Sequence, residues 1–292
     1  MRNRVFGSIA TLALVALIHA PSARAQAAQA TKTGRAGGPR TYPPPPPGPA
    51  HDPHDLSGTW MHYGPGFGGG ALGRPRLGTE WGMEELPLTP AGLAALNGNH
   101  SAKGPRSDVP AKGNDPLSDA NVPGLLRTLI YDRPFQFIHT QDKVVQIFEW
   151  FRIWREMWTD GRKMPEDPGP RLYGYSVAKW DGDVLDVETY GLDPRLWGDE
   201  WGMPFSESMR IHERWHRTDQ DNLELVMNFS DPVMYTRAWS SELKRFRLQK
   251  KGMPDAEMLE VIFTPMDEQD FNKNIRNPGS LGIAGPKSGV KK

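Results

Sequence analysis

Apolar and polar residues alternate through much of the chain between residues 135 and 248, with the period of two that is typical of half-buried β-strands. Residues 135–158 are dense in aromatic and β-branched types, which favours strands. Two alternating runs between Gly174 and Tyr190 flank Asp181-Gly182, and glycine accepts the positive φ that a two-residue hairpin turn requires. The pattern predicts further strands over residues 209–217, 223–229 and 235–248.

One short helix is expected before these strands. Thr89 and Pro90 can cap and begin it, apolar residues follow at helical spacing, and Asn97-Gly98 can end it. Many short strands in hairpin sequence, with almost no helix, indicate an all-β fold: a single antiparallel meander that closes as a β-barrel with few short helices. We expect this barrel to occupy residues 55–250.

The first 25 residues have the pattern of a secretory signal peptide. Arg2 and Arg4 precede an apolar stretch over residues 9–18, and Ala23 to Ala25 offers small residues at the cleavage positions. That apolar stretch is too short to span a bilayer, and no other run approaches the required length. The sequence therefore predicts cleavage after Ala25, a periplasmic or secreted location and no transmembrane segment.

Two regions outside the expected barrel lack periodic apolar residues. Residues 26–54 are rich in Ala, Gly and Thr and carry a proline run from Pro43 to Pro47, which favours an extended, disordered linker. After about residue 250 the alternation decays, so residues 251–292 are expected to form a C-terminal extension that is largely disordered at its end.

Charge and cysteine content narrow the function classes. The chain has 35 basic and 35 acidic residues, and cleavage of residues 1–25, which hold three Arg and no acid, leaves a mildly acidic protein. This balance argues against a nucleic-acid partner, which calls for a basic surface. The absence of Cys excludes disulfides, a thiolate nucleophile and cysteine metal sites. His212 and His216 lie on the polar face of an expected strand, so neither a metal nor another cofactor is expected.

Short motifs in the barrel region resemble known families. Ser57-Gly58-Thr59-Trp60 before a meander is similar to the Gly-x-Trp opening of lipocalins and other calycins, in which the tryptophan closes the barrel floor. The Thr159–Arg162 segment, the Trp180-Asp181-Gly182-Asp183 hairpin and Asp231-Pro232 resemble a group of uncharacterised exported bacterial proteins that open with a Leu-Ser-Gly-x-Trp segment. This resemblance covers residues 55–250 and departs from the group in lacking Cys. It implies a lipocalin-like barrel and an exported location, without implying a reaction.

Strand parity brings four ionisable residues to the same side of the expected sheet, because residues two apart in a strand share a face. If these faces point inward, the four side chains meet inside the barrel, where a Glu could act as a general acid or base. The alternative is a structural Glu–Arg pair that fixes the register of the strands, and a bend within residues 150–152 would change the parity. The four candidate catalytic residues are His139, Glu149, Arg155 and Glu213.

Aromatic residues are candidates for contacts with an apolar ligand. The motif Glu-Trp-Gly-Met occurs twice, at residues 80–83 and 200–203, each time in a loop rich in Gly and Pro. Tryptophan in such a loop either plugs the end of a barrel or lines the mouth of a ligand site. The candidate ligand-binding residues are Trp81, Trp150, Trp197, Trp201 and Tyr175.

Three functions remain open at this point. The first is a periplasmic or secreted protein that binds an apolar or aromatic small molecule inside its β-barrel. The second is a cofactor-independent lyase, hydratase or isomerase, in which Glu149 or Glu213 moves a proton with His139 and Arg155 as partners. The third is a structural protein of the cell envelope. The sequence carries no motif that identifies a ligand, a substrate or an oligomeric state.

Overall fold

The computed structural model describes residues 51–63, 78–82 and 84–276 of the chain. The expected signal peptide, nearly all of the Pro-rich linker and the last residues of the chain lie outside these ranges. Within the ranges, no helix combines the length and the apolar character needed to cross a bilayer. The folded part already contacts the barrel at His51, whose Nε2 lies 2.8 Å from the Arg217 carbonyl oxygen, before the expected start at Asp55.

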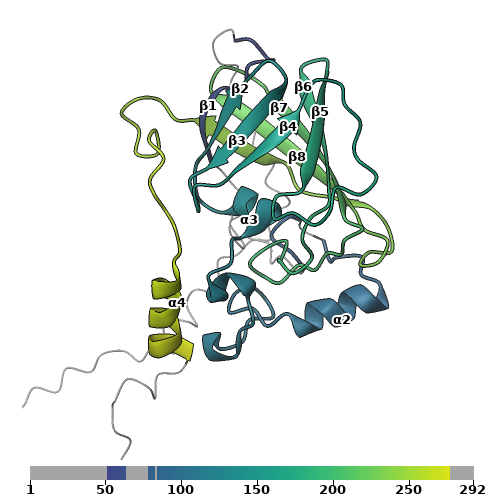
Figure 1. Cartoon of the computed structure of the whole chain (residues 1–292), viewed down its shortest axis with the longest axis vertical. Helices are drawn as coiled ribbons and strands as arrows, with labels where there is room; N and C mark the ends of the chain where they lie inside the picture. The colour runs from purple at the N-terminus through teal and green to yellow at the C-terminus, as the bar shows by residue number, and fades with distance from the viewer. Residues whose placement is uncertain (1–50, 64–77, 83, 277–292) are drawn as a thin grey trace, which may run out of the picture. The chain divides into compact units, whose positions relative to one another are not determined.

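Nine strands close into one barrel (Figure 1). Their order around the barrel follows the chain from the first strand to the eighth, and the last strand closes the ring by pairing with both of them. A short further strand, β9 (Trp239–Ser240), pairs with β8 outside the ring. The barrel strands are β1 (Gly58–His62), β2 (Phe135–His139), β3 (Lys143–Phe148), β4 (Trp154–Trp158), β5 (Tyr175–Asp181), β6 (Val184–Tyr190), β7 (Arg210–Arg217), β8 (Asn222–Ser230) and β10 (Lys244–Leu248).

One neighbouring pair in the ring is parallel. β4 and β5 run in the same direction, with Met157 opposite Ser176, because residues 159–174 carry the chain back to the starting end before β5 begins. The prediction of a wholly antiparallel meander is therefore wrong, whereas a single β-barrel with few short helices is confirmed. Residues 159–174 have no alternating pattern that could have indicated a crossover.

The hairpin between β5 and β6 turns one residue later than the sequence predicts. Asp181 pairs with Val184 inside the ladder, so Gly182 and Asp183 form the two-residue turn. Gly182 has a φ of +57°, and a Cβ added there would meet nothing within 4 Å. Backbone conformation rather than space therefore requires glycine at the first turn position.

Aromatic side chains fill the inside of the barrel. Phe135 packs against Trp215, Phe246 and Phe137 with ring centroids between 5.0 and 5.7 Å apart, mostly edge to face. These side chains are 0–2% exposed, as is Trp60, whose indole Nε1 donates to the Leu56 carbonyl oxygen at 2.9 Å. Close packing of this kind stabilises the barrel through burial of large apolar side chains and leaves little room for a ligand.

Short helices gather at one end of the barrel (Figure 1). All seven residues of α3 are buried, and this helix lies directly beneath the barrel in Figure 1. α2 begins where the sequence predicts, because Pro90 fixes the first turn and the Thr89 hydroxyl accepts the Gly92 N–H at 3.0 Å. The helices are α2 (Pro90–Gly98), η1 (Pro110–Lys112), η2 (Pro116–Asp119), α3 (Gly124–Ile130), α4 (Pro265–Phe271) and the π-helical turn η3 (Asn272–Arg276).

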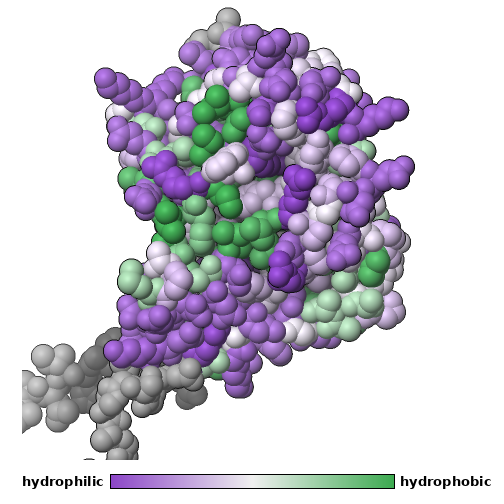
Figure 2. All heavy atoms as spheres, viewed as in Figure 1, coloured by the Kyte–Doolittle hydropathy of each residue, from purple (hydrophilic) through white to green (hydrophobic). Residues whose placement is uncertain are grey.

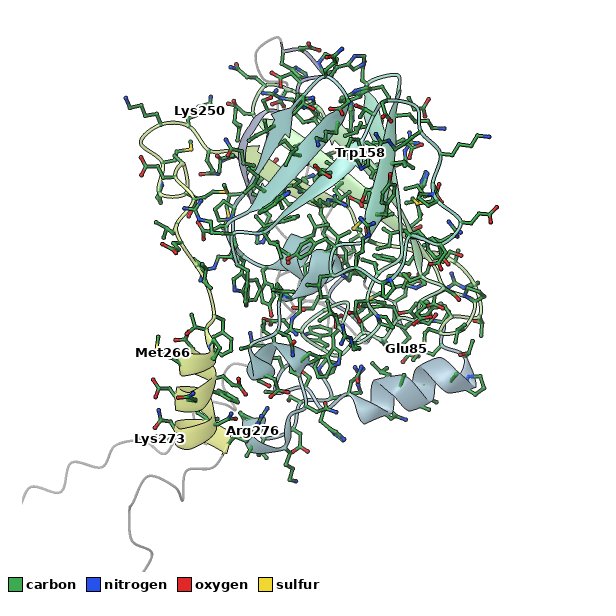
Figure 3. All side chains as sticks on the ribbon, viewed as in Figure 1. Glu85, Trp158, Lys250, Met266, Lys273 and Arg276 are labelled. Carbon is green, nitrogen blue, oxygen red and sulfur yellow. The ribbon has the colours of Figure 1, made fainter. Side chains whose placement is uncertain are left out.

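Residues 251–276, called the strap below, run outside the barrel from the end of β10 to α4 and η3 (Figure 1). Val261 forms a parallel bridge with Trp150, in the turn between β3 and β4. At the far end, the Arg276 guanidinium donates to Asp119 and Ser118 of η2, both at 2.9 Å (Figure 3). The described part of the C-terminal extension is therefore attached to the body of the protein at both ends.

Candidate functional site

A buried ion pair crosses the inside of the barrel. Arg155 of β4 donates through both terminal nitrogens to the two carboxylate oxygens of Glu213 of β7, at 2.7 and 2.6 Å. The side chains are 1% and 0% exposed. Inward-pointing positions of two uninterrupted strands place these groups, as the parity of residues 209–217 predicts. Two of the four candidate catalytic residues therefore meet.

Further polar groups saturate this ion pair. Trp215 Nε1 donates to one Glu213 oxygen at 2.9 Å, and the Thr189 hydroxyl donates to the other at 3.1 Å. Arg155 Nε donates to the side-chain amide oxygen Oε1 of Gln146 at 2.8 Å, while Gln146 Nε2 has no hydrogen-bond partner among the described residues. Every oxygen of Glu213 thus already accepts two hydrogen bonds, which stabilises the charge without leaving the carboxylate free for a substrate.

The other two candidate catalytic residues lie elsewhere. In β3 the even positions, including Gln146, point inward, whereas in β4 the odd positions do. The change occurs at the turn between the strands, where Phe151 and Arg152 adopt φ values of +62° and +50°. The parity predicted across residues 144–157 is therefore wrong for β3 and correct for β4. Such left-handed φ values at residues other than glycine are uncommon and cost energy, so their neighbours must hold this turn in place.

Glu149 helps to hold the strap against that turn. Its carboxylate accepts the Leu259 N–H at 2.9 Å and lies 3.5 Å from the Arg133 guanidinium. The Phe151 N–H donates to the Val261 carbonyl oxygen at 2.6 Å beside it. Glu149 is buried, yet it faces the strap rather than the inside of the barrel, so its role in the structure is a link between two segments.

His139 is the last residue of β2, and its side chain holds the segment just before β1. Its Nε2 accepts the Leu56 N–H at 3.0 Å. Burial lowers the pKa of His139, with Asp55 opposing the shift, which favours the neutral ring that can accept this bond. His139 therefore does not join Arg155 and Glu213, and the expected cluster of four divides into one pair and two separate residues.

A cavity of about 650 Å³ lies between the helices beneath the barrel and the strap; we call it the strap cavity. One wall of it is apolar and comes from the β3–β4 turn and the strap. Figure 2 shows apolar residues gathered across the middle of this face, below the polar surface of the barrel. The apolar wall consists of Trp150, Val261, Ile262, Phe263, Phe271 and Ile275.

The part of the strap cavity lining that comes from α3 and the neighbouring loops is mainly polar, and we call it the polar wall. Arg127 of α3 donates through both terminal nitrogens to Asp115, at 2.5 and 2.6 Å, and through Nε to the Tyr131 hydroxyl at 2.8 Å. Burial raises the pKa of the Tyr131 phenol well above its usual value, which keeps it neutral and able to donate. The ring of Tyr131 also packs edge to face against Trp150, so it joins the two walls.

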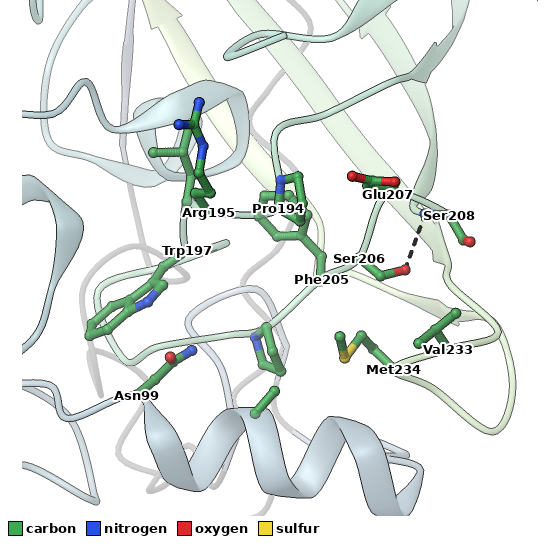
Figure 4. A pocket seen from close by; sticks show the side chains of 13 residues that line it. Asn99, Pro194, Arg195, Trp197, Phe205, Ser206, Glu207, Ser208, Val233 and Met234 are labelled. Atoms are coloured by element: carbon green, nitrogen blue, oxygen red, sulfur yellow. Dashed lines mark hydrogen bonds between the residues drawn. The ribbon is translucent and has the colours of Figure 1, made fainter. Parts of the chain in front are cut away.

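A second cavity of about 510 Å³ lies between α2 and the loops that precede β7 and β9 (Figure 4). Trp197 and Phe205 line it together with Arg195, Ser206 and Asn99. Its Ser206 hydroxyl donates to Asp231 at 2.8 Å, which leaves the serine as part of a loop-stabilising pair. Polar and apolar groups share this cavity about equally, in contrast to the mainly apolar strap cavity.

The aromatic residues expected to bind a ligand divide between these places. Trp150 lines the strap cavity and Trp197 the second cavity. Trp81 is fully buried with its Nε1 donating to the Gly198 carbonyl oxygen at 2.9 Å, and Trp201 packs close to Gly104. Tyr175 lies at the outside beside Arg171, whose guanidinium is 5.2 Å from the ring centroid. Trp150 thus borders the mainly apolar strap cavity.

The repeated Glu-Trp-Gly motif brings its two copies together. Asp199 accepts the Thr79 hydroxyl at 2.6 Å and the Glu80 N–H at 2.9 Å, and the Glu80 carboxylate accepts the Glu200 N–H at 2.9 Å. Burial, together with the nearby Asp199 charge, raises the pKa of Glu80 to about 7. The repeat therefore fixes two loops to each other, and Trp81 is fully buried beside them.

Sequence reasoning missed the polar wall of the strap cavity. Arg127, Tyr131 and Asp115 come from short helices and their connections. Apart from Trp150, the apolar wall comes from the strap, more than 100 residues later, which the decaying alternation marked as an extension. One signal was available: Val261, Ile262 and Phe263 form an apolar run before the capping residue Thr264. Such a run in an otherwise polar tail indicates packing against another surface.

Comparisons with family models, with curated proteins and with solved structures find no match to this chain.

Proposed function

We propose that the protein is an exported, lipocalin-like β-barrel protein that binds an apolar or aromatic small molecule in the strap cavity. The observation that carries this proposal is the contrast between a barrel filled by its own aromatic side chains and a 650 Å³ cavity with an aromatic wall beside it. Ligand sites are commonly concave, mainly apolar and furnished with a few polar groups, and they have volumes of about 300–1,000 Å³. The strap cavity meets each of these criteria.

The sequence motifs support the remaining parts of the proposal. Trp60 is fully buried at the start of the barrel, which agrees with the role that the Gly-x-Trp tryptophan has in calycins. The export signal rests on the pattern of residues 1–25. The site, however, differs from the ligand position expected inside the barrel, because Trp215 and its neighbours occupy that space.

The acid–base alternative gains no comparable support. Glu213 and Arg155 are saturated by each other and by Thr189 and Trp215, and both are inaccessible to solvent. A general base must reach the proton it removes within hydrogen-bond distance. Glu149 is engaged with Leu259 and Arg133, so neither carboxylate is placed to approach a substrate.

The proposal can be tested with a neutral aromatic probe, N-phenyl-1-naphthylamine, whose fluorescence rises in apolar surroundings. We expect saturable binding of one probe molecule by the full chain and a loss of about tenfold in affinity for Trp150→Ala, because an aromatic wall supplies much of the buried contact area. Trp154→Ala is the matched control, since Trp154 is 62% exposed on the outer face of β4 and lies outside the cavity lining.

Equal affinities of the two variants would contradict a site in the strap cavity. A complete absence of saturable binding would contradict small-molecule binding and favour the structural role in the envelope. A complementary measurement is mass spectrometry of small molecules that copurify with the wild-type protein and are lost from Trp150→Ala.

A further inference from the structure

The charged side chains on the wall of the strap cavity already have partners. Lys103 Nζ donates to both Glu200 carboxylate oxygens, at 2.8 and 2.7 Å. Arg127 is paired through two hydrogen bonds with Asp115, as described above. Each cation that borders this part of the cavity is therefore neutralised by an acid that borders it too.

The two remaining charged groups of the lining are also engaged. Arg133 lies 3.5 Å from Glu149. Asp267 accepts both the backbone N–H and the hydroxyl of Thr264 at 2.7 Å, in the capping box that begins α4. The cavity consequently offers an incoming ligand no charged group that is free of a partner among the described residues.

We propose that the ligand of the strap cavity is an uncharged amphipathic molecule, with an apolar part about the size of an aromatic ring system and a neutral hydroxyl or carbonyl group. This inference rests on the proposed function of the same cavity. A charged group carried into the cavity would lose hydration and would meet only charges that an opposite partner already neutralises, so the lost hydration free energy is not fully recovered.

A neutral polar group can be accommodated without such a cost. The Glu200 oxygens and Asp115 Oδ2 retain lone pairs that can accept a ligand hydroxyl, whereas Asp115 Oδ1 already accepts both Arg127 and the Leu117 N–H. The Lys103 ammonium retains a third N–H that a ligand carbonyl can accept. These groups lie on one wall, whereas Phe263, Phe271 and other apolar side chains lie on the other. The two walls therefore orient the ligand with its polar group toward Glu200 and Asp115.

Two fluorescent probes test the charge preference directly. N-phenyl-1-naphthylamine and 8-anilino-1-naphthalenesulfonate have the same aromatic body and differ in one sulfonate group. We expect the full chain to bind the neutral probe about tenfold more tightly than the anionic one, because the sulfonate finds no free cation in the cavity. For both probes, Trp150→Ala should lower the affinity for the strap cavity.

A charge variant sharpens the test. Glu200→Gln frees Lys103 from its carboxylate, so we expect the affinity for the anionic probe to rise about threefold or more while the affinity for the neutral probe changes little. Glu156→Gln is the matched control, because Glu156 forms a similar pair with Lys143 at 2.6 Å on the outer face of the barrel, away from the cavity.

The outcomes separate the inference from the proposed function. Equal or tighter binding of the anionic probe, with dependence on Trp150, would overturn the neutral-ligand inference and leave the site in the strap cavity intact. Binding that ignores Trp150 for both probes would overturn the site itself and, with it, the inference. An unchanged anionic affinity in Glu200→Gln would show that the Lys103–Glu200 pair does not set the charge preference, which also contradicts the inference.

Discussion

Two arginine–carboxylate pairs of similar geometry occupy opposite surroundings in this protein. Arg155 and Glu213 meet inside the barrel, and Arg127 and Asp115 meet on the wall of the strap cavity, with bidentate hydrogen bonds of 2.5–2.7 Å in each pair. The first pair is 0–1% exposed inside the barrel, whereas beside the second lies a cavity of about 650 Å³. The same chemical unit therefore lies within a closed core in one place and borders a cavity in the other.

The difference follows from the elements that carry the two pairs. Side chains converge on the barrel interior from strands on all sides, and alternate positions interdigitate there. The strap cavity is instead bordered by α3, the loops beneath the barrel and a segment that is fixed mainly near Val261 and Arg276. Irregular segments that are fixed at two points fill space less closely than strands do, and a cavity remains between the strap and the helices.

Removal of the carboxylate from each pair should have the largest effect and should separate the two surroundings. Glu213→Ala leaves Arg155 charged and fully buried, and we expect it to lower the free energy of unfolding by about 3–5 kcal/mol. Asp115→Ala should cost about 1–3 kcal/mol, because the Asp115 side chain is 22% exposed and water can reach the vacated position. Guanidinium-induced unfolding of both variants measures the difference.

A double variant controls for a failure to fold. Glu213→Leu combined with Arg155→Met replaces the buried pair by apolar groups of similar size, and it should recover most of the lost stability. Equal costs of the two single alanine variants would contradict the distinction drawn between the barrel and the cavity.

Glu80 lies between the barrel and the strap cavity, and its titration should give the next largest change in the free energy of unfolding. Folding raises the pKa of Glu80 from an ordinary 4.5 to about 7. Between these values the folded protein retains a proton that the unfolded chain releases, so the free energy of unfolding should fall by up to about 3 kcal/mol as the pH rises from 4.5 to 7. The free energy of unfolding, measured at several pH values across this range, should fall more steeply with pH for the wild type than for Glu80→Gln.

The exposed Glu84 provides the reference for that measurement. Glu84→Gln should leave the slope of stability against pH unchanged, because its side chain is 88% exposed. Identical slopes in the wild type and Glu80→Gln would mean that the carboxyl of Glu80 does not keep its proton in the folded protein.

Loosening of the strap should give the smallest effect and should leave the barrel intact. Glu149→Ala removes the acceptor of the Leu259 N–H, and we expect a loss of about 1–2 kcal/mol together with hydrogen exchange about tenfold faster in residues 257–263. Exchange in β7 should not change.

Glu156→Ala, which breaks an outer pair with Lys143, should cost at most about 1 kcal/mol and leave the strap unaffected. Similar exchange in both variants would rule out a link through Glu149.

The sequence allows much of the barrel to be predicted, because uninterrupted strands report which side chains point inward. β7 is the clearest case: Glu213 and Trp215 point inward while His212 is exposed, as the alternation predicts. The prediction fails where the backbone changes direction without a warning in the residue types. Phe151 and Arg152 adopt left-handed φ values that favour glycine, and neither residue type indicates such a turn.

The candidate site was less predictable, because it depends on contacts between distant segments. Arg155 and Glu213 could be brought together by parity alone, since each lies within a regular strand. The strap cavity joins the region around Tyr131 to the region around Phe263, and no local pattern specifies how a loop and a tail approach each other. Trp150, a predicted ligand-binding residue, lines the strap cavity, and its contact with a ligand remains a prediction.

The closure of the barrel between β1 and β10 also determines how it would respond to mechanical force. Trp60 of β1 lies opposite Leu248 of β10, and the Gln249 N–H donates to the Thr59 carbonyl oxygen, so the chain enters and leaves this junction at the same end. A pull on both flanking segments would first separate the strap contacts at Val261 and Arg276 and the contacts of His51 and Leu56. It would then load the β1–β10 pairs one at a time from Thr59 and Gln249, so that the two strands unzip rather than shear.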